Sequence, residues 1–515
     1  MKKIISLPIL ATAGICTLTS AQPTGCDSNR QRPNIILFLV DDMGWQDTSV
    51  PFWNRETLFN QLYETPNMER LAQQGMKFTQ AYACTVSSPS RCSLLSGMNA
   101  ARHRVTNWTL ERDTPTDKDD SVIEIPAWHV NGMAQVPGVP AATQITSFVQ
   151  ILKDKGYHTI HCGKAHFGAV DTPGADPRHF GFDVNIAGHA AGGLASYLGK
   201  DNFGNDAEGH PLAYNAVPDL EAYHGKDIFI TEALTREALR ALENNRASGK
   251  PFFLNMAHHA VHIPIQADHR FYQKYLDKGM DTTEAAYASM IEGMDKSLGD
   301  IMDWLEVKDL AENTIILFMS DNGGLSITNR GGVPNTHNVP LNSGKGSAYE
   351  GGIREPMIVS WPGVVAPNTQ TQEFVIIEDF FPTILEMAGI RRYKTVQTVD
   401  GISFVPILKG EKQKHAESRC LYWNFPNLWR APFGPGIDAT CSIREGDWKL
   451  IYYYRSGKKE LFNIRENIGE TDNCALAQPE RVASLSAKLG RYLRSVNAQR
   501  PTFIATGLPV PWPDE

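Results

Sequence analysis

Ser87 and Arg91 lie in the segment SSPSRCSLLSG (residues 87–97), whose residue types and spacing suit chemistry on an anion. Pro89 fits the first position of a helix, because its φ is preset and the N–H it lacks would have no partner there. Ser87 is then expected near a helix N-terminus, where partial positive charge favours an anion, and Arg91 can turn back toward it. The segment predicts attack on a tetrahedral oxyanion such as sulfate or phosphate, although a capped helix start alone would explain the same residues.

Acidic side chains follow two short apolar runs. The run NIILFLV ends in Asp41 and Asp42, and the run TIILFMS ends in Asp321 and Asn322. Such runs are typical of strands buried on both faces of a mainly parallel sheet, and the carboxyl ends of neighbouring strands can meet at one edge. Three carboxylates and an amide oxygen suit Ca²⁺ or Mg²⁺ better than zinc. We therefore expect a metal site here, the alternative being that each pair only caps a turn.

Basic and histidine side chains occur in three further segments. Lys164 and His166 lie in GKAHFG after a predicted strand, His262 lies in AVHIP, and Lys345 lies in GKGSAYEGG. Cleavage of a sulfate ester needs cations that neutralise its oxygens and a donor that protonates the leaving alcohol. Taken singly, each residue has an ordinary explanation as a solvated charge or a hydrogen-bonded loop histidine. It is the resemblance of these segments to the motifs of one family that implies a single catalytic site.

These segments together resemble the formylglycine-dependent sulfatases, arylsulfatase-like carbohydrate sulfatases of the alkaline phosphatase superfamily. The family signature C/S-x-P-S-R-x-x-L-L-T-G matches residues 87–97, with Ser87 at the position that is converted to formylglycine (3-oxoalanine). The serine form resembles the bacterial version, whose partner is a radical-type sulfatase-maturating enzyme. NIILFLVDDMGW and IILFMSDNGG resemble the two metal-binding segments. The resemblance implies Ca²⁺, with Mg²⁺ as the lesser alternative, bound by the following residues: Asp41, Asp42, Ser87, Asp321 and Asn322.

The resemblance also implies a covalent mechanism at residue 87. One hydroxyl of the hydrated formylglycine attacks sulfur, and the second hydroxyl then expels sulfate. Lys164 bridges nucleophile and sulfate, and His166 orients the hydrate. Ala165 stands where the family commonly has Trp, a change expected to affect packing more than chemistry. An unmodified serine would form a sulfate ester with no such exit, so turnover is expected to need the modification.

The remaining implied roles concern charge and the leaving group. Arg91 holds the charged intermediate, and Lys345 is the second sulfate-binding cation. His262 matches the His of the family segment A-P-H-x-P, with Val261 in place of the usual Pro. It contacts sulfate, and either His262 or Lys345 protonates the departing alcohol.

Aromatic and polar residues near these segments are candidates for sugar contact. Asn107 and Trp108 follow the signature, His258 lies at a predicted strand end, and Trp423 opens the C-terminal region. Rings at a pocket rim stack on sugars, whereas core packing is the ordinary use of such residues. The resemblance, together with an N-terminal export signal, favours a sulfated glycan as substrate. A general likeness of residues 106–110 and 163–197 to carbohydrate-active members implies galactose or N-acetylgalactosamine as the sulfated unit.

The N-terminus predicts export. Two lysines precede an apolar run at residues 4–18, and Thr-Ser-Ala at 19–21 offers a cleavage site, so residues 1–21 are interpreted as a signal peptide and the protein as periplasmic. Cys26 offers a less favoured lipid attachment, and no other stretch approaches the length of a membrane span. A net charge of −8 argues against nucleic acid as a partner.

Alternating apolar and amphipathic segments predict an α/β fold, a doubly wound and mainly parallel sheet flanked by helices. We expect a catalytic domain over residues 22–415 and a smaller α+β subdomain with an antiparallel sheet over 416–515. Cys420 would pair with Cys441 or Cys474, or these thiols stay free. The expected strands are 34–40, 157–161, 251–256, 314–319 and 357–361, and the expected helices are 68–75, 146–155, 228–244, 285–305, 377–388 and 479–496.

Two other functions remain open at this point. A phosphomonoesterase or phosphodiesterase of the same superfamily would use similar residues, but such enzymes generally hold two zinc ions through several histidines, whereas the donor set here is oxygen-rich. A catalytically silent glycan-binding protein would leave Ser87 unconverted. A binding protein, however, has no need of the whole acid–base set.

Overall fold

The computed structural model describes Met1 and residues 32–411, 418–429 and 434–515. Apart from Met1, the predicted signal peptide (1–21) lies outside these ranges, and so does Cys26. No helix among the described residues is both long and apolar enough to span a membrane.

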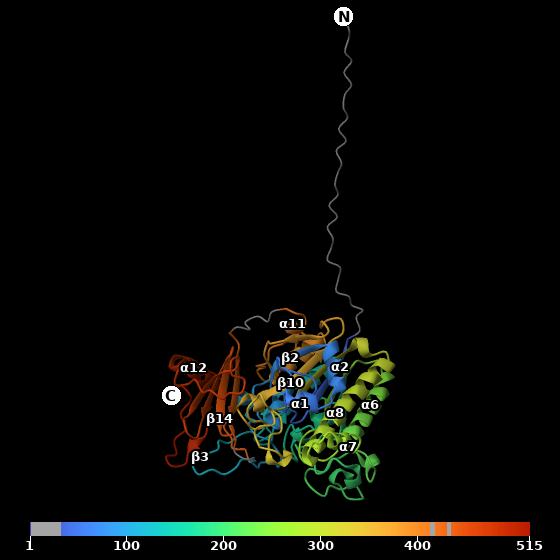
Figure 1. Cartoon of the computed structure of the whole chain (residues 1–515), viewed down its shortest axis with the longest axis horizontal. Coiled ribbons are helices and arrows are strands. Elements are labelled where there is room, and N and C mark those ends of the chain that lie inside the picture. The colour runs from blue at the N-terminus through green and yellow to red at the C-terminus, as the bar shows by residue number, and fades with distance from the viewer. Residues whose placement is uncertain (2–31, 412–417, 430–433) are drawn as a thin grey trace.

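A large, mainly parallel sheet forms the centre of the molecule (Figure 1). Its strands run in the order β11-β2-β10-β9-β1-β8-β6-β7, with β12 also paired to β2, and β10 is antiparallel to both its neighbours. The predicted fold class is confirmed. The strands are β1 (Asn34–Val40), β2 (Met76–Tyr82), β6 (His158–Gly163), β7 (Val184–Ile186), β8 (Phe252–Ala257), β9 (Thr314–Ser320), β10 (Arg354–Ser360), β11 (Thr369–Thr371) and β12 (Val375–Ile376).

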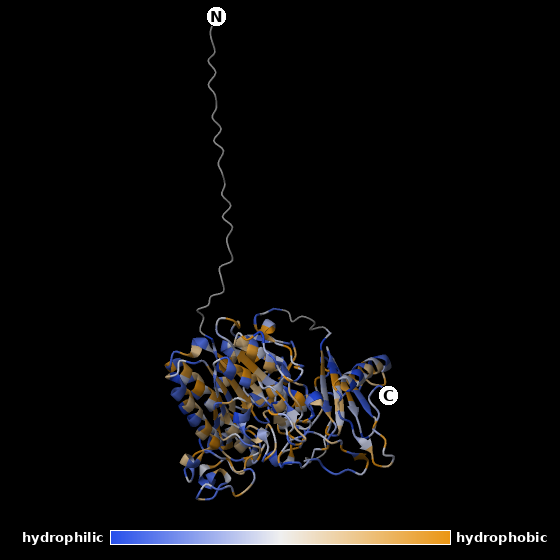
Figure 2. Ribbon diagram, turned by 180° about the vertical axis from the view of Figure 1, so that it is seen from behind, coloured by the Kyte–Doolittle hydropathy of each residue, from blue (hydrophilic) through white to orange (hydrophobic). Residues whose placement is uncertain are grey.

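The continuous apolar runs become strands because helices cover both faces of the sheet. Every residue of β1, β8, β9 and β10 is buried, and apolar residues gather in the central strands in Figure 2. One core contains Ile36 and Phe38 of β1, and the other contains Ile35 and Leu37. Successive side chains of a strand point to opposite faces, so a strand buried on both sides has no polar alternation.

Two layers of helices enclose this sheet. Helices α2, α6 and α8 contribute to the core that contains Phe38, and α3, α5 and α10 to the core that contains Leu37. The helices are α1 (Leu58–Leu62), α2 (Pro66–Gln74), α3 (Ser87–Ser96), α4 (Ala100–His103), α5 (Phe148–Asp154), α6 (Ile230–Arg246), α7 (Tyr272–Asp277), α8 (Thr282–Val307), α9 (Glu350–Ile353), α10 (Phe380–Met387), α11 (Val405–Leu408) and α12 (Pro479–Ser495).

The C-terminal region adds an antiparallel sheet, seen with α12 at one end of the molecule in Figure 1. The antiparallel sheet predicted for this region is confirmed, and its strands β15 and β16 form a hairpin. The described cysteines, Cys420, Cys441 and Cys474 among them, carry free thiols. The sheet consists of β13 (Cys420–Phe425), β14 (Thr440–Glu445), β15 (Trp448–Tyr453) and β16 (Lys459–Asn463), and two small pairs join β3 (Ile123–Glu124) to β17 (Thr502–Phe503) and β4 (Met133–Ala134) to β5 (Thr143–Gln144).

Candidate active site

The two acidic strand ends meet at one edge of the large sheet. β1 and β9 are parallel neighbours, with Asn34 paired to Thr314 and Val40 to Ser320, so the residues that follow both strands are brought together. The carboxylates of Asp41, Asp42 and Asp321 each offer an oxygen within 4.8 Å of the others, and all three residues are fully buried. This confirms the expected proximity and gives an all-oxygen donor set.

Ser87 points into this acidic cluster. Its Oγ lies 3.0 Å from Asn322 Oδ1 and 3.3 Å from Asp41 Oδ1. Helix α3 begins at Ser87 itself, so Pro89 is the third helical residue and not the first as predicted. Pro is tolerated there because the first turn of a helix has no internal acceptor for its N–H groups. Ser87 therefore occupies the helix N-terminus, as the sequence indicated.

Each carboxylate of the cluster is paired with a cation. Lys164 Nζ lies 2.6 Å from Asp41 Oδ2 and also donates to Ser87 Oγ at 2.9 Å. Lys345 Nζ donates to Asp42 Oδ2 at 2.8 Å. Arg91 donates through Nε to Asp321 Oδ2 at 2.8 Å and through Nη1 to the Lys164 carbonyl at 2.7 Å. The Arg91 Nη2 group is buried and has no partner among the described residues.

Burial and neighbouring charges shift the pKa values in opposite directions within the cluster. Burial, with repulsion from Asp321 and Asp42, raises the pKa of Asp41 to about 8 despite the nearby Lys164. Burial also acts to raise the pKa of Asp42, but Lys345 and His262 outweigh it and hold that pKa below its usual range. Burial lowers the pKa of Lys164. Asp42 and Asp41 outweigh burial and raise the pKa of Lys345.

Two histidines present one free ring nitrogen each. His166 donates from Nε2 to the Thr109 carbonyl at 2.9 Å, and its buried Nδ1 has no partner among the described residues. His262 donates from Nδ1 to the Ile263 carbonyl at 2.7 Å, which leaves Nε2 3.8 Å from Asp42 Oδ2. Burial lowers the pKa of His166 well below its usual value, and burial with the nearby Lys345 lowers that of His262 to about 3. Both imidazole rings are therefore neutral at neutral pH, and each has one ring nitrogen that can accept a hydrogen bond.

Six of these side chains form the floor of a cavity of about 670 Å³. Asp41, Asp321 and Arg91 are not among its lining residues and are buried beneath it. The chemically active lining residues are Asp42, Ser87, Lys164, His166, His262 and Lys345. The other lining residues are mainly apolar and include Trp108, Leu110, Leu194, Tyr214, Ile263 and Trp429.

Comparison with known proteins identifies the family. Residues 33–390 match the family model described as Sulfatase. The chain belongs to the sulfatase family. Residues 344–499 of this sulfatase also match the model for the C-terminal part of N-sulphoglucosamine sulphohydrolase. The protein is thus an enzyme, a sulfuric ester hydrolase, and the family assignment made from its motifs is confirmed.

Individual relatives resemble this sulfatase along most of its length. A sulfatase of Formosa agariphila is 31% identical over 98% of this chain and 96% of its own. The N-acetylgalactosamine-6-sulfatase of Canis lupus familiaris is 27% identical over 84% of this chain and 80% of its own. Among solved structures, Ps i-CgsB in complex with k-i-k-neocarrahexaose is 26% identical, with a TM-score of 0.69, and the match covers 90% of this chain and 93% of that one.

Of the four residues predicted for sugar contact, one lines the cavity and three do not. Trp108 lines the cavity of the sulfatase. Asn107 is fully buried beside it, donates to Asp117 Oδ1 at 2.9 Å and accepts from the Trp108 N–H. His258 is buried with Nε2 2.8 Å from Ser297 Oγ. Trp423 is buried and donates from Nε1 to the Ala83 carbonyl at 2.8 Å. The structure therefore brings only the first of these four to the cavity.

Trp429 lines the cavity and was not identified from the sequence. It lies in the loop after β13, where no apolar periodicity or motif marks it as a pocket residue. Gly192 and Gly193, which line the cavity beside His166 and His262, were also missed. Loop residues of this kind carry little sequence signal because their position depends on packing across distant segments.

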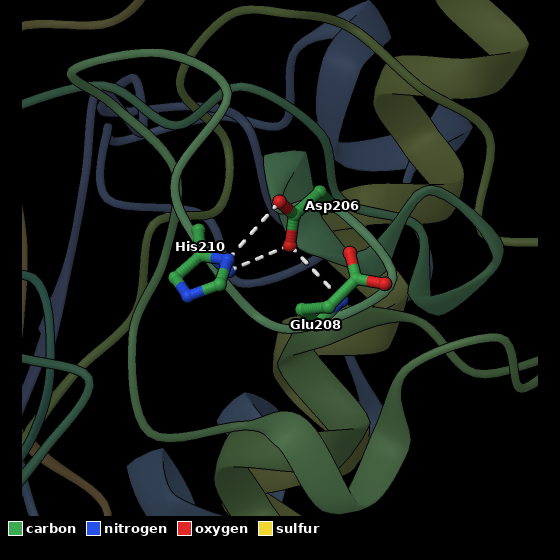
Figure 3. Close-up of side chains that lie close together, drawn as sticks. All are labelled: Asp206, Glu208 and His210. Atoms are coloured by element: carbon green, nitrogen blue, oxygen red, sulfur yellow. Dashed lines mark hydrogen bonds and ion pairs between the residues drawn. The ribbon is translucent and has the colours of Figure 1, made fainter.

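A second group of possible metal ligands lies away from this cavity. Asp206, Glu208 and His210 come close together in a loop (Figure 3). Asp206 Oδ1 accepts from the backbone N–H groups of Glu208 and His210, at 3.0 and 2.8 Å. Glu208 and His210 are exposed. Asp206 thus organises a turn, as aspartate commonly does, and we assign no site to this group.

Proposed function

We propose that this sulfatase is exported and removes a sulfate ester from a sugar of a sulfated glycan, with galactose or N-acetylgalactosamine as the sulfated unit. The observation that carries the proposal is the meeting of Ser87, Lys164 and the acidic cluster at the floor of a cavity with aromatic walls. The glycan is supported by the names of relatives, an N-acetylgalactosamine-6-sulfatase and a protein bound to k-i-k-neocarrahexaose. Export is supported by the character of the N-terminal sequence.

The donor atoms of the cluster fit a hard divalent cation. Three buried carboxylates, the Asn322 amide oxygen and the residue 87 oxygen form an oxygen-only set of the kind Ca²⁺ prefers. We infer that Asp41, Asp42, Ser87, Asp321 and Asn322 would hold Ca²⁺, and that Mg²⁺ is the weaker fit because it demands a stricter octahedral geometry. When bound, such an ion would polarise a sulfate oxygen and orient the nucleophile.

Residue 87 is the inferred nucleophile, matured from Ser87 to formylglycine by a radical-type maturating enzyme. Formylglycine would supply a hydrated aldehyde, whose two hydroxyl groups allow both attack and release. The surroundings of Ser87 support this position, because Lys164 Nζ lies 2.9 Å from Oγ and the helix N-terminus stabilises an anion. His166 lines the same cavity as Ser87, and because its Nδ1 has no partner among the described residues, it can accept a hydrogen bond from a hydroxyl group at residue 87.

The remaining polar groups would handle the sulfate and the leaving alcohol. Lys164 and Lys345 line the cavity and can donate to sulfate oxygens while keeping their aspartate partners. Arg91 lies beneath them and neutralises Asp321. His262 can deliver a proton from Nε2 once a bound anion favours its imidazolium form, because Nδ1 is already committed to the Ile263 carbonyl.

The test combines maturation with a defined substrate panel. The protein is produced together with a radical-type maturase, and the residue 87 peptide is examined by mass spectrometry. Hydrolysis of regiochemically defined sulfated monosaccharides is then measured for the wild type, Ser87→Ala and Ser96→Ala. We expect residue 87 to be converted and a sulfated galactose or N-acetylgalactosamine to be hydrolysed. Activity should fall to background in Ser87→Ala. It should be retained in the control Ser96→Ala, because the Ser96 hydroxyl bonds backbone groups of Cys92 and Met98.

Three results would contradict the proposal. Activity retained in Ser87→Ala would remove the nucleophile assignment. Faster hydrolysis of aryl phosphate than of aryl sulfate would favour a phosphatase. An unmodified Ser87 after coexpression, with tight glycan binding and no hydrolysis of any sulfated sugar, would favour a glycan-binding protein.

A further inference from the structure

Two tryptophans from distant parts of the chain line the same cavity. Trp108 lies in the loop after α4, and Trp429 lies in the loop after β13 of the C-terminal sheet. The Trp429 ring lies against the backbone of Gly346, where an added Cβ would be only 2.6 Å from ring atom Cζ3. Gly346 directly follows Lys345 and its N–H donates to the Thr85 carbonyl at 2.8 Å. The ring is therefore packed against the residue that follows Lys345.

One carboxylate holds the loops of both tryptophans. Asp117 Oδ1 accepts from Asn107 Nδ2 at 2.9 Å and from Asn427 Nδ2 at 2.8 Å. Asn107 precedes Trp108 and accepts from its N–H at 2.9 Å, and Asn427 lies two residues before Trp429. Both asparagines are fully buried. Asp117 therefore links two loops that are separated by more than 300 residues in the sequence.

Neighbours of Asp117 strengthen the same link. Its second oxygen, Oδ2, accepts from Trp128 Nε1 at 2.7 Å, which fixes the orientation of the carboxylate. The Thr116 hydroxyl donates to the Trp108 carbonyl at 2.6 Å, and the Lys118 N–H donates to the Leu428 carbonyl at 3.0 Å. Residues 116–118 thus contact the backbone next to each tryptophan, and hydrogen bonds to an ionised carboxylate are the strongest of these contacts.

We propose that Trp108 and Trp429 form the binding site for the leaving sugar and that Asp117 is the positioning residue that sets both rings. The ring faces provide apolar surface for the C–H face of a pyranose, while the floor residues hold its sulfate. The proposal rests on the proposed glycan substrate. The proposal also gives the buried Asn107 a role. Asn107 hydrogen-bonds both Asp117 and the Trp108 N–H, so the position of Asp117 sets the position of the Trp108 loop.

The experiment compares a sugar sulfate with a substrate that lacks the sugar. The matured enzyme is assayed with the best sulfated monosaccharide of the panel and with 4-nitrophenyl sulfate, as wild type, Asp117→Asn, Trp429→Ala and the double variant. Asp117→Asn replaces an acceptor by an N–H₂ group that must face a donor, so we expect the ratio of the two kcat/KM values to fall about tenfold, mainly through KM for the sugar. Asp119→Asn, an exposed change two residues away, is the control and should keep the ratio.

The double variant distinguishes positioning from independent effects. If Asp117 acts through the tryptophans, adding Asp117→Asn to Trp429→Ala should lower the ratio by clearly less than the product of the single effects. Trp429→Ala keeps the test valid if Asp117→Asn folds poorly, because Trp429 is a partly exposed loop residue. An unchanged ratio in both single variants, or equal losses on both substrates, would overturn the inference. If the wild type hydrolysed no sulfated sugar, the proposed function would fail instead.

Discussion

At the residue scale, the three carboxylates at and beneath the cavity floor are buried, and each lies beside a cation. Lys164 pairs with Asp41, Lys345 with Asp42, and Arg91 with Asp321, at 2.6, 2.8 and 2.8 Å. A buried charge is tolerated only when it is paired and hydrogen-bonded, so these pairs stabilise one another. They also hold donors in fixed positions around residue 87, which is the arrangement that stabilises developing negative charge without reorganisation.

The backbone at Gly192 and Gly193 packs closely against the rings of His166 and His262. An added Cβ at Gly192 would lie 2.6 Å from His166 Nδ1, whereas at Gly193 it would lie 3.0 Å from His262 Cε1. Gly192→Ala must therefore displace the His166 ring, and we expect kcat/KM to fall about a hundredfold, the typical effect of a misplacement of about 1 Å. Steady-state kinetics on an aryl sulfate measure this.

Gly193→Ala is the graded control for this prediction, because its neighbour needs to move only by tenths of an ångström. We expect a smaller loss of kcat/KM in Gly193→Ala, with circular dichroism and the melting temperature close to wild type in both variants. Equal activity of Gly192→Ala and wild type would show that the His166 ring position is not needed.

At the element scale, strand ends build the site and a buried ion network joins it to the C-terminal sheet. Lys449 of β15 is fully buried and lies 3.0 Å from Glu350 Oε1 and 2.8 Å from Glu470 Oε1. Glu350 begins α9, five residues after Lys345, and also accepts from the Tyr82 hydroxyl of β2 at 2.7 Å. The C-terminal sheet therefore supports the segment that carries Lys345.

Removing the central cation of this network should destabilise the fold. Lys449→Met leaves Glu350 and Glu470 without it, and breaking a buried ion pair in this way costs about 3–5 kcal/mol. We expect the free energy of unfolding in urea to fall by roughly that amount. Arg465→Met is the matched control in the same region, because its pair with Asp447 is largely exposed and such pairs contribute at most about 1 kcal/mol. Similar effects of the two variants would refute the interpretation.

At the scale of the whole molecule, stability also depends on buried groups that do not line the cavity. Glu378 accepts from Asn99 Nδ2 through Oε1, and its buried Oε2 has no partner among the described residues. Burial, with repulsion from Asp379, raises the pKa of Glu378 to about 8. The folded protein then holds a proton that the unfolded chain releases above its ordinary pKa of 4.5.

The raised pKa of Glu378 makes the stability of the fold depend on pH. Because the folded state binds more protons, stability falls as pH rises from about 4.5 to about 8, by at most ~1.4 kcal/mol per pH unit for this group. Glu378→Gln cannot ionise, so its stability relative to wild type should increase across that window, as measured by urea unfolding at several pH values. The exposed change Glu466→Gln should leave the profile as it is. Parallel profiles for Glu378→Gln and wild type would argue against a raised pKa.

Metal binding should also affect the whole molecule, because the proposed ligands directly follow β1 and β9 or begin α3. A cation that binds only the folded state stabilises it by RT ln(1 + [L]/Kd), about 2.7 kcal/mol at a hundred times Kd. We expect a chelator to lower the melting temperature of the wild type and Ca²⁺ to restore it better than Mg²⁺. Asp42→Asn should lose most of this response. Identical melting curves with and without chelator and added Ca²⁺ would remove the proposed metal site.

Much of the fold and of the cavity floor was predictable from the sequence. The apolar runs before Asp41 and Asp321 are β1 and β9, and their register places both acidic ends together. Helix α3 begins at Ser87, two residues before the start predicted at Pro89, because a proline fits any position in the first turn. Strand-end residues can be predicted because a parallel sheet collects its carboxyl ends at one edge, whatever fills the rest of the core.

The sequence by itself determined which residues could do chemistry, and only the tertiary structure decided which loop residues line the cavity. Trp423 and Trp429 lie in the same stretch of sequence, yet Trp423 is buried with its Nε1 bonded to the Ala83 carbonyl, whereas Trp429 lines the cavity. The role of Asp117 is equally invisible in the sequence, since its partners are distant along the chain. The physical reason is that strand ends follow from local periodicity, whereas the exposure of a loop side chain follows from packing between segments that are far apart in the sequence.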